Sequence, residues 1–287
     1  MYAANRVRYN AVLTGASRER RDVDGKRVTI GVKDWDRIFD ALERTTVVDE
    51  IRREVYPDDY ADGLKALSMV VLSELRWCAD ALALAPGDAF LDLGCGLGGP
   101  GGWLADATAT SATCVDVSLV ALRHARAHDA ARAPGRARHV VADAGRLPLA
   151  GARFRGALAV DVLQCLPDKP AALGELARCL APGARFAVAT RELRAPEARD
   201  LPHPIVADHE PLLRAAGFEL LRRDEPDGWE PCHRKYYTRL LERREEIAAR
   251  GGAVLERAAV RDAENVLSML DVTRRVLLLA QRTASSA

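Results

Sequence analysis

The sequence predicts an α/β fold with a doubly wound, seven-stranded and mainly parallel sheet, an N-terminal helical cap and a helical lid inserted before the last strand. Short apolar runs of strand character alternate with helical stretches between residues 89 and 190. An aspartate stands at or just after the end of four of these runs, at positions 92, 116, 143 and 161. A charged helical insertion of about 45 residues, much longer than the usual connection, precedes the last apolar run. Strands separated by helices pair in parallel, and such sheets bind ligands at the carboxyl ends of their strands.

The composition allows one domain with a cap and argues against several classes of partner. The chain of 287 residues is long enough to bury a full core. Its 42 basic and 41 acidic side chains nearly cancel, so we expect no nucleic acid as the main ligand. No apolar run reaches the roughly 20 residues of a membrane span, and the start lacks the pattern of a signal peptide. The six cysteines form no C-x-x-C pair, so we expect no disulfides, no metal site and a cytoplasmic location.

Residues 1–85 are predicted to form an arm followed by a helical cap. Residues 1–33 are polar, basic and irregular, and they form either a solvated arm or an arm exchanged in a homodimer. Helical patterns follow at residues 35–42, from residue 46 to the residue before Pro57, and from residue 60 to residue 84.

A glycine-rich stretch, FLDLGCGLGGPGGW at residues 90–103, marks the centre of the predicted site. An apolar run ends at Asp92, six glycines follow, and helical character resumes near Trp103. A strand, a glycine turn and a helix in this order make a place for a nucleotide-like ligand. Glycines let the backbone approach such a ligand closely, and the free N–H groups of the helix point at it.

The glycine pattern alone leaves the ligand open. Gly94, Gly96 and Gly99 satisfy G-x-G-x-x-G, and Asp116 follows at about the spacing of a ribose-binding acid, which is also the pattern for NAD. Three features favour a different, cationic nucleotide. Asp92 suits an amino group, Asp143 ends a later strand, and a long helical stretch precedes the motif, whereas a nicotinamide fold usually starts near its first strand.

The rest of the chain divides into a core at residues 86–225, a lid at residues 226–272 and a final strand and tail at residues 273–287. Strands are expected at residues 89–91, 111–117, 139–142, 156–160, 185–190, 218–222 and 276–280. Helices are expected between them at residues 119–128, 171–180 and 209–216.

Five segments of the core resemble motifs of the class I S-adenosylmethionine-dependent methyltransferases. They are LDLGCGLGG (91–99), CVDVS (114–118), VVADAGRLPL (140–149), AVDVLQCLPD (159–168) and LAPGARFAVAT (180–190), in the order and spacing of the family. The GCGxGGPG form is most similar to the branch that methylates small molecules such as quinones, sugars, sterols and terpenoids. The resemblance implies S-adenosylmethionine as the cofactor, and a cap and lid that cover the carboxyl ends of the strands.

The resemblance also implies which residues bind the cofactor. The turn around Cys95 is expected to pack against the methionine part, and Asp116 to accept both ribose hydroxyls, since a carboxylate can take two hydrogen bonds. Asp143 is expected to face the adenine, and Asp161 the methionine amino group or the acceptor. The predicted set is Asp92, Gly94, Cys95, Gly96, Gly98, Asp116, Val117, Asp143, Ala144 and Asp161. Any one of these aspartates, taken singly, also fits a helix N-cap.

The chain departs from its relatives where many small-molecule members carry a histidine. Gln164 and Cys165 stand there instead, and Cys165 fits either packing or a catalytic thiolate. Methyl transfer from a sulfonium needs mainly alignment, which can contribute about 7–11 kcal/mol, and needs a base only if the acceptor loses a proton during the reaction. The candidate catalytic residues are His203, His209 and Gln164, with Glu192, Asp208 and His233 as further candidates for a base. Each of these also fits an ordinary surface residue.

Aromatic residues of the lid are the candidates for binding an acceptor. Trp229, Tyr236 and Tyr237 are predicted to line the acceptor pocket, joined from the cap by Trp35, Tyr56 and Tyr60. The same aromatics also fit a plain hydrophobic core. Arg234 and Lys235 beside them could meet an acidic group of the acceptor.

We therefore predict an enzyme that transfers a methyl group from S-adenosylmethionine to an oxygen, carbon or nitrogen atom of a small, specialised-metabolite acceptor. The departure near Gln164 leaves a cyclase or isomerase that retains the cofactor as an alternative. A non-catalytic cofactor-binding protein is a second alternative, and a nicotinamide oxidoreductase a third.

Overall fold

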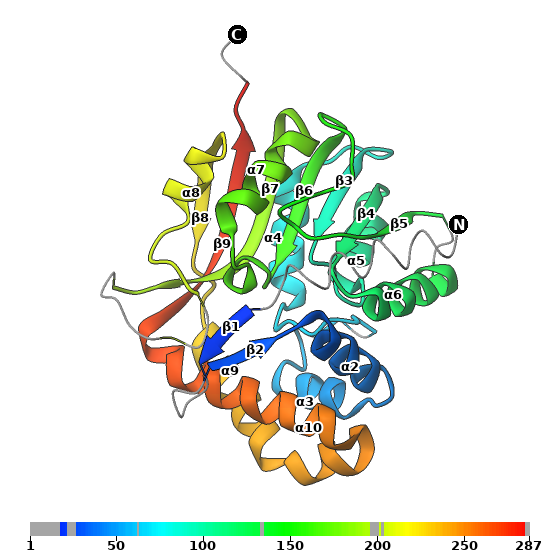
Figure 1. Ribbon diagram of the computed structural model, residues 1–287, viewed down its shortest axis with the longest axis vertical. Coiled ribbons are helices and arrows are strands. Elements are labelled where there is room, and N and C mark those ends of the chain that lie inside the picture. The colour runs from blue at the N-terminus through cyan, green and yellow to red at the C-terminus, as the bar shows by residue number, and fades with distance from the viewer. Residues whose placement is uncertain are drawn as a thin grey trace.

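The computed structural model describes residues 18–21, 27–61, 63–132, 135–195, 201 and 204–284, and only the backbone of residues 18–30. Seven strands form one sheet in the order β5-β4-β3-β6-β7-β9-β8 (Figure 1). The strands are β3 (Ala89–Leu93), β4 (Ser111–Asp116), β5 (Ala137–Val141), β6 (Phe154–Val160), β7 (Leu180–Leu193), β8 (Phe218–Asp224) and β9 (Thr273–Arg282). Neighbouring strands from β5 to β7 are parallel, and β9 lies antiparallel between β7 and β8. The predicted seven-stranded, mainly parallel sheet is confirmed.

Helices cover both faces of the sheet. One face carries α4 (Leu72–Leu82), α5 (Gly99–Thr108) and α6 (Leu119–Arg132), and the other α7 (Lys169–Cys179) and α8 (Glu210–Ala215). Strand β3 is buried on both sides, with Phe90 in the cluster under α4 and α5, and Leu91 in the cluster under α7. Because both faces are covered, the strands read as continuous apolar runs rather than alternating ones.

A helical layer covers the carboxyl ends of the parallel strands (Figure 1). It combines α2 (Val32–Glu43) and α3 (Val47–Val55) from the cap with α9 (Trp229–Glu242) and α10 (Arg244–Met269) from the lid. These four helices share one buried apolar cluster, which includes Phe39, Ile51, Leu240 and Val266. The cap and the lid therefore pack together as one layer, although the core separates them in the sequence.

Ion pairs on the outer surface also join the cap and the lid. Arg250 of α10 donates to Glu50 of α3 over 2.6 Å and to Thr46 over 2.9 Å, and Arg239 of α9 pairs with Glu54 over 2.9 Å. Hydrogen bonds from Arg250 and Thr46 lower the pKa of Glu50 to about 2. These groups are solvent-exposed and screened by water, so each pair contributes little to stability.

The helix predicted from residue 60 is wrong at its start, because α4 begins only at Leu72. Before it, the chain runs across the glycine-rich loop, where the carbonyl of Lys65 accepts a hydrogen bond from the Gly99 N–H over 2.9 Å. Asp59 fixes the start of α4, since its carbonyl and its carboxylate accept from the backbone N–H groups of Leu72 and Ser73.

Two further features complete the fold. A separate antiparallel pair, β1 (Arg18–Arg21) and β2 (Arg27–Ile30), precedes α2, and most of the predicted arm lies outside the described residues. None of the helices in the described part of the chain combines the length and apolar character needed to cross a membrane.

Candidate active site

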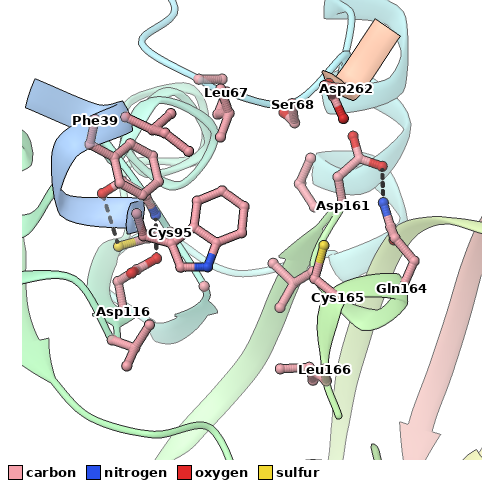
Figure 2. Close-up of a pocket in the computed structure, with 18 of the residues that line it drawn as sticks. Phe39, Leu67, Ser68, Cys95, Asp116, Asp161, Gln164, Cys165, Leu166 and Asp262 are labelled. Carbon is pink, nitrogen blue, oxygen red and sulfur yellow. Dashed lines mark hydrogen bonds between the residues drawn. The ribbon is translucent and has the colours of Figure 1, made fainter. Parts of the chain in front are cut away.

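A cavity of about 560 Å³ lies between the carboxyl ends of the parallel strands and the helical layer. The wall on the side of the sheet includes nine of the ten predicted cofactor residues: Asp92, Gly94, Cys95, Gly96, Asp116, Val117, Asp143, Ala144 and Asp161. The opposite wall, on the side of the helical layer, comes from α2, α9, α10 and residues 66–69. Figure 2 shows Cys95 and Asp116 on one side of this space, and Asp161, Gln164 and Cys165 on the other. Gly98, the tenth predicted residue, is the N-cap of α5 and lines a smaller neighbouring pocket instead.

The glycine-rich loop is held tightly against two neighbouring strands. The backbone N–H groups of Gly94 and Cys95 both donate to the carbonyl of Val115, over 2.8 and 3.0 Å. Gly94 has φ +70°, and a Cβ there would lie 2.5 Å from Cγ2 of Val162. Only glycine fits this turn, which leaves the backbone open toward the cavity.

Asp116, at the end of β4, is tied to the glycine-rich loop. Its Oδ2 accepts from the Gly96 N–H and its Oδ1 from the Ser118 N–H, both over 2.9 Å. The carboxylate is thereby oriented at the cavity wall, as a ribose-binding acid requires. Asp143, at the next strand end, accepts from the Gly145 N–H over 2.7 Å.

Asp92 is a buried acid at the floor of the cavity. Burial, and secondly the nearby charge of Asp116, raise its pKa to about 7. Its Oδ2 is buried and has no hydrogen-bond partner among the described residues. A cationic ligand group beside this oxygen would compensate the burial of the charge.

Asp161 follows β6 and belongs to a buried network. It accepts hydrogen bonds from Arg275 of β9 and, over 2.9 Å, from Gln164 Nε2. Arg275 also donates twice to Glu74 of α4, over 2.9 and 2.8 Å. Burial alone raises the pKa of Asp161, but the charge of Arg275 and these hydrogen bonds lower it overall. Asp161 is therefore held ionised at the cavity wall.

Most of the predicted catalytic residues do not lie in a position to take a proton from a ligand. Gln164 lines the cavity, but its amide is engaged between Asp161 and the Thr190 hydroxyl, which donates over 2.7 Å. His209 is buried away from the cavity, where its backbone N–H donates to Glu192 over 2.9 Å.

Of the remaining catalytic candidates, some line the cavity and others do not. Glu192 and Asp208 pair with Arg223 and do not line the cavity. His203 lies outside the described residues. Cys165 does line the cavity, half-buried, beside Gln164 (Figure 2). His233 of α9 also lines it.

The predicted aromatic wall is only partly formed by the residues expected. Trp35, Tyr236 and Tyr237 line the cavity, whereas Trp229, Tyr56 and Tyr60 do not. Trp229 packs behind the wall, its ring centroid 5.2 Å from the guanidinium carbon of Arg191. Arg234 and Lys235, which were predicted to meet an acidic group of the acceptor, are also absent from the wall. Arg234 pairs with Glu230 and Asp271 on the surface, and Lys235 is exposed.

Several cavity residues were missed by the sequence analysis. Arg191 lies near the carboxyl end of β7, and Asp262 and Asn265 lie on α10. Arg191 could have been found, because it directly follows the apolar run at residues 185–190, just as the aspartates follow theirs. Asp262 and Asn265 lie in a charged helix, where the pattern does not separate a cavity residue from a solvated one.

Comparison with known proteins identifies the family. Residues 90–183 match the model of a methyltransferase domain. An O-methyltransferase of Pyrenophora dematioidea is 38% identical over 124 residues, which are 43% of this chain and 44% of that protein. Methyltransferase GfsG of Streptomyces halstedii is 32% identical over 199 residues, which are 63% of this chain and 69% of that protein.

The chain belongs to the S-adenosylmethionine-dependent methyltransferases. A solved structure described as the [4+2]-cyclase SpnF has the same fold, with a TM-score of 0.67, 23% identity, and coverage of 86% of this chain and 97% of that one. The predicted family, fold, enzyme class and cofactor, and methyl transfer to a small-molecule acceptor, are confirmed. S-adenosylmethionine supplies an activated methyl group, and the unpartnered oxygen of Asp92 together with the oriented Asp116 fits a cationic nucleoside of this kind.

Proposed function

We propose that this methyltransferase acts on an oxygen atom of a small, mainly apolar specialised metabolite. The observation that carries the proposal is that one cavity joins the carboxylates of the core to an apolar wall of the lid, which includes Leu240, Leu255 and Met269. Its volume of about 560 Å³ is within the range of ligand pockets. The similarity to an O-methyltransferase of Pyrenophora dematioidea supports oxygen as the accepting atom.

The roles of the individual residues form part of the proposal. Asp116 would hold the ribose, Asp143 and Ala144 the adenine, and Asp92 the charged amino end, with Gly94, Cys95, Gly96 and Val117 packed against the cofactor. Tyr236 and Tyr237 would hold the acceptor against the transferable methyl group. The cap and the lid exclude water, which favours transfer to the acceptor over hydrolysis.

The test is incubation with S-adenosylmethionine labelled in its methyl group and a panel of hydroxylated aromatic and polyketide-like compounds. We expect labelled methyl ethers together with S-adenosylhomocysteine, and no labelled product from Asp116→Ala at the same cofactor concentration. Labelled products only on carbon or nitrogen would contradict the assignment to oxygen.

A cyclase or isomerase that retains the cofactor is the second candidate. It is favoured by two observations, the solved cyclase of the same fold and the engagement of Gln164 with Asp161 and Thr190, which leaves no general base at that position. The same incubation separates the two reactions, because a cyclase returns a product of unchanged mass and leaves the labelled cofactor intact. Binding of the cofactor with neither outcome across the panel would favour a non-catalytic protein.

The setting of the enzyme is a further part of the proposal. All six cysteines are free, which supports a reducing, cytoplasmic location. The net charge of +1 supports a partner other than nucleic acid. A homodimer stays a prediction, and sedimentation velocity tests it.

A further inference from the structure

Arg191 is a buried arginine in the wall of the cavity. It is 5% exposed and lies near the carboxyl end of β7, the strand next to β6. Its Nη2 donates to Nδ1 of His233 over 2.6 Å, and its guanidinium lies against the ring of Trp229, 5.2 Å from the centroid. These contacts come from two turns of α9, so the lid fixes the orientation of a core arginine.

Unlike the other buried arginine of this site, Arg191 has no ion pair. Arg275 is bonded to Glu74 and Asp161, whereas no carboxylate oxygen lies within 4.0 Å of Arg191 among the residues that the structure describes. Its Nη1 is buried and has no hydrogen-bond partner in the same part of the chain. A buried cation without an anionic partner is costly, so a negatively charged group beside Arg191 would be stabilising.

The charges around Arg191 do not replace a direct partner. Asp161 and Asp262 are nearby, but neither carboxylate lies within 4.0 Å of Arg191 among the described residues, and Arg275 and Gln164 already bind Asp161. His233 is neutral, since burial and the charges of Arg191 and Arg275 lower its pKa well below the ordinary value. Burial is also the main cause that lowers the pKa of Arg191. The cofactor would add a sulfonium to this space, which increases the demand for a negative group.

We infer that Arg191 binds a negatively charged oxygen of the acceptor, so that the acceptor enters the cavity as an anion. This inference rests on the proposed function and narrows its substrate class. The anionic oxygen is either the methylated atom itself, as in a phenolate or an enolate, or a separate carboxylate of the same molecule. Both present the same chemistry to the guanidinium.

For a phenolate or enolate, the inference also explains why the site lacks the histidine of its relatives. The acceptor hydroxyl gives its proton to solvent as it binds, because the guanidinium stabilises the anion. The oxygen then forms the new O–CH₃ bond while the S–CH₃ bond breaks, and the electron pair of that bond neutralises the sulfonium. No proton remains to be removed in the transfer step, so no protein base is needed.

The first experiment measures binding without turnover. Protein saturated with S-adenosylhomocysteine is titrated with 2-naphthoate and with 2-naphthamide, which differ in charge but little in shape. We expect wild type to bind the carboxylate at least about tenfold more tightly than the amide, since hydrogen bonds to charged groups are strong. Arg191→Gln should lose this preference and Arg191→Lys should keep part of it. Arg194→Gln is the matched control, because Arg194 also lies against Trp229 but pairs with Glu225 and does not line the cavity.

Three results of this titration would overturn the inference. They are equal or undetectable binding of both probes by wild type, an undiminished preference in Arg191→Gln, and an equal loss of preference in Arg194→Gln. A loss of S-adenosylhomocysteine affinity in Arg191→Gln would overturn it as well, because Arg191 would then hold the carboxylate of the cofactor. Thermal unfolding of each variant identifies misfolding, and Arg191→Lys carries the test if Arg191→Gln does not fold.

The second experiment separates the two sources of the anion. Methyl transfer to phenol and to the more acidic 4-nitrophenol is compared with transfer to 4-hydroxymethylbenzoate, whose carboxylate is separate from its hydroxyl. Preference for 4-nitrophenol, lost in Arg191→Gln, supports the methylated oxygen as the anion. Preference for 4-hydroxymethylbenzoate, lost in the same variant, supports a separate carboxylate. Failure of methyl transfer with every compound would count against the proposed function, and the binding experiment would still decide the role of Arg191.

Discussion

Nη2 of Arg191 donates to Nδ1 of His233 over 2.6 Å, and this contact decides where the proton of His233 resides. A guanidinium can only donate, so Nδ1 must accept and the neutral ring carries its proton on Nε2. The pKa of His233 is lowered well below its ordinary value, first by burial and then by Arg191 and Arg275. His233 therefore positions Arg191, and its Nδ1 is occupied and not available as a base.

Loss of the Asp116 carboxylate should weaken cofactor binding strongly. Asp116→Ala removes the acceptor that the Gly96 and Ser118 N–H groups orient, and with it the two charge-assisted hydrogen bonds that we propose to the ribose. We expect the dissociation constant of S-adenosylhomocysteine to rise by at least about tenfold, and both S-adenosylmethionine and S-adenosylhomocysteine to bind wild type far more tightly than NAD. Calorimetry measures both, with Asp106→Ala as a surface control. Unchanged affinity in Asp116→Ala would refute the ribose assignment.

Cofactor affinity should depend on pH through Asp92. Its pKa is raised to about 7, so the carboxyl is neutral below that pH, and a cationic cofactor favours the ionised form. Affinity for S-adenosylmethionine should therefore increase as the pH rises toward about 7, by at most about tenfold per pH unit, and level off above it. Calorimetry at about pH 6 and about pH 8 tests this, and Asp92→Asn should lose the dependence.

The same group gives the opposite sign for the stability of the cofactor-free protein. The pKa of Asp92 is raised from its ordinary value of 3.8 to about 7, so between these pH values the folded state binds a proton that the unfolded state has released. Its contribution to the free energy of unfolding should fall as the pH rises from 3.8 to about 7 and stay constant beyond. Asp92→Asn should remove this fall in urea titrations, and an identical pH profile for the two proteins would contradict it.

Replacement of the cavity cysteine should have little effect on turnover. Cys165 lies half-buried beside Gln164, and the reaction proposed here needs no thiolate. We expect Cys165→Ser to retain most of the wild-type kcat/KM. A loss of more than about a hundredfold, the lower range for general acid–base catalysis, would instead indicate a catalytic thiol.

Acceptor kinetics should respond to the lid aromatics according to their place in the wall. Tyr236→Ala and Tyr237→Ala should raise the acceptor KM or lower kcat with little change in S-adenosylhomocysteine affinity, because both tyrosines line the lid side of the cavity. Trp229→Ala should act through Arg191 and affect anionic acceptors most. Tyr60→Phe is the control, since Tyr60 bonds to Asp49 outside the cavity. Normal kinetics in all three alanine variants would show that the lid is not the acceptor wall.

Two glycine substitutions should change stability in opposite directions. Gly252 interrupts α10 with φ 82° and ψ 167°, a conformation that is essentially restricted to glycine. Gly252→Ala should therefore lower the free energy of unfolding by about 1–3 kcal/mol. Gly174 lies inside α7 with open space around it, so Gly174→Ala should raise that free energy by about 0.5–1 kcal/mol. Urea denaturation measures both, and effects of the same sign would contradict the conformational argument.

Prediction from the sequence succeeds where a local pattern determines the position of a residue in the fold. Asp116 and Asp161 were found because carboxyl ends of parallel strands meet at one edge of the sheet. The same rule applies to Arg191, which also follows an apolar run. The pairing of Arg275 with Glu74 joins residues 201 positions apart, and no local pattern contains it.

Predictions from the sequence were wrong where one sequence pattern fits two different structures. The apolar residues Leu64 and Leu67 repeat at helical spacing, yet they lie in an irregular segment before α4. Leu64 packs in the core cluster under α4 and α5, and Leu67 packs against the apolar cluster of the cap and the lid. Trp229 is aromatic and belongs to the lid, as predicted, but its ring supports Arg191 from behind instead of facing a ligand. Sequence composition places such residues near a site, and only packing decides which way they face.

The joint packing of the cap and the lid bears on how acceptor choice could be engineered. Glu50 and Glu54 of the cap meet Arg250 and Arg239 of the lid, and both segments share one apolar cluster. A lid transplanted alone from a relative would face a foreign cap, with mismatched charges and poorly filled core positions. A chimera that exchanges residues 32–55 together with residues 229–269 would keep this interface intact. We therefore expect acceptor choice to transfer to such a chimera only when both segments are exchanged as a pair.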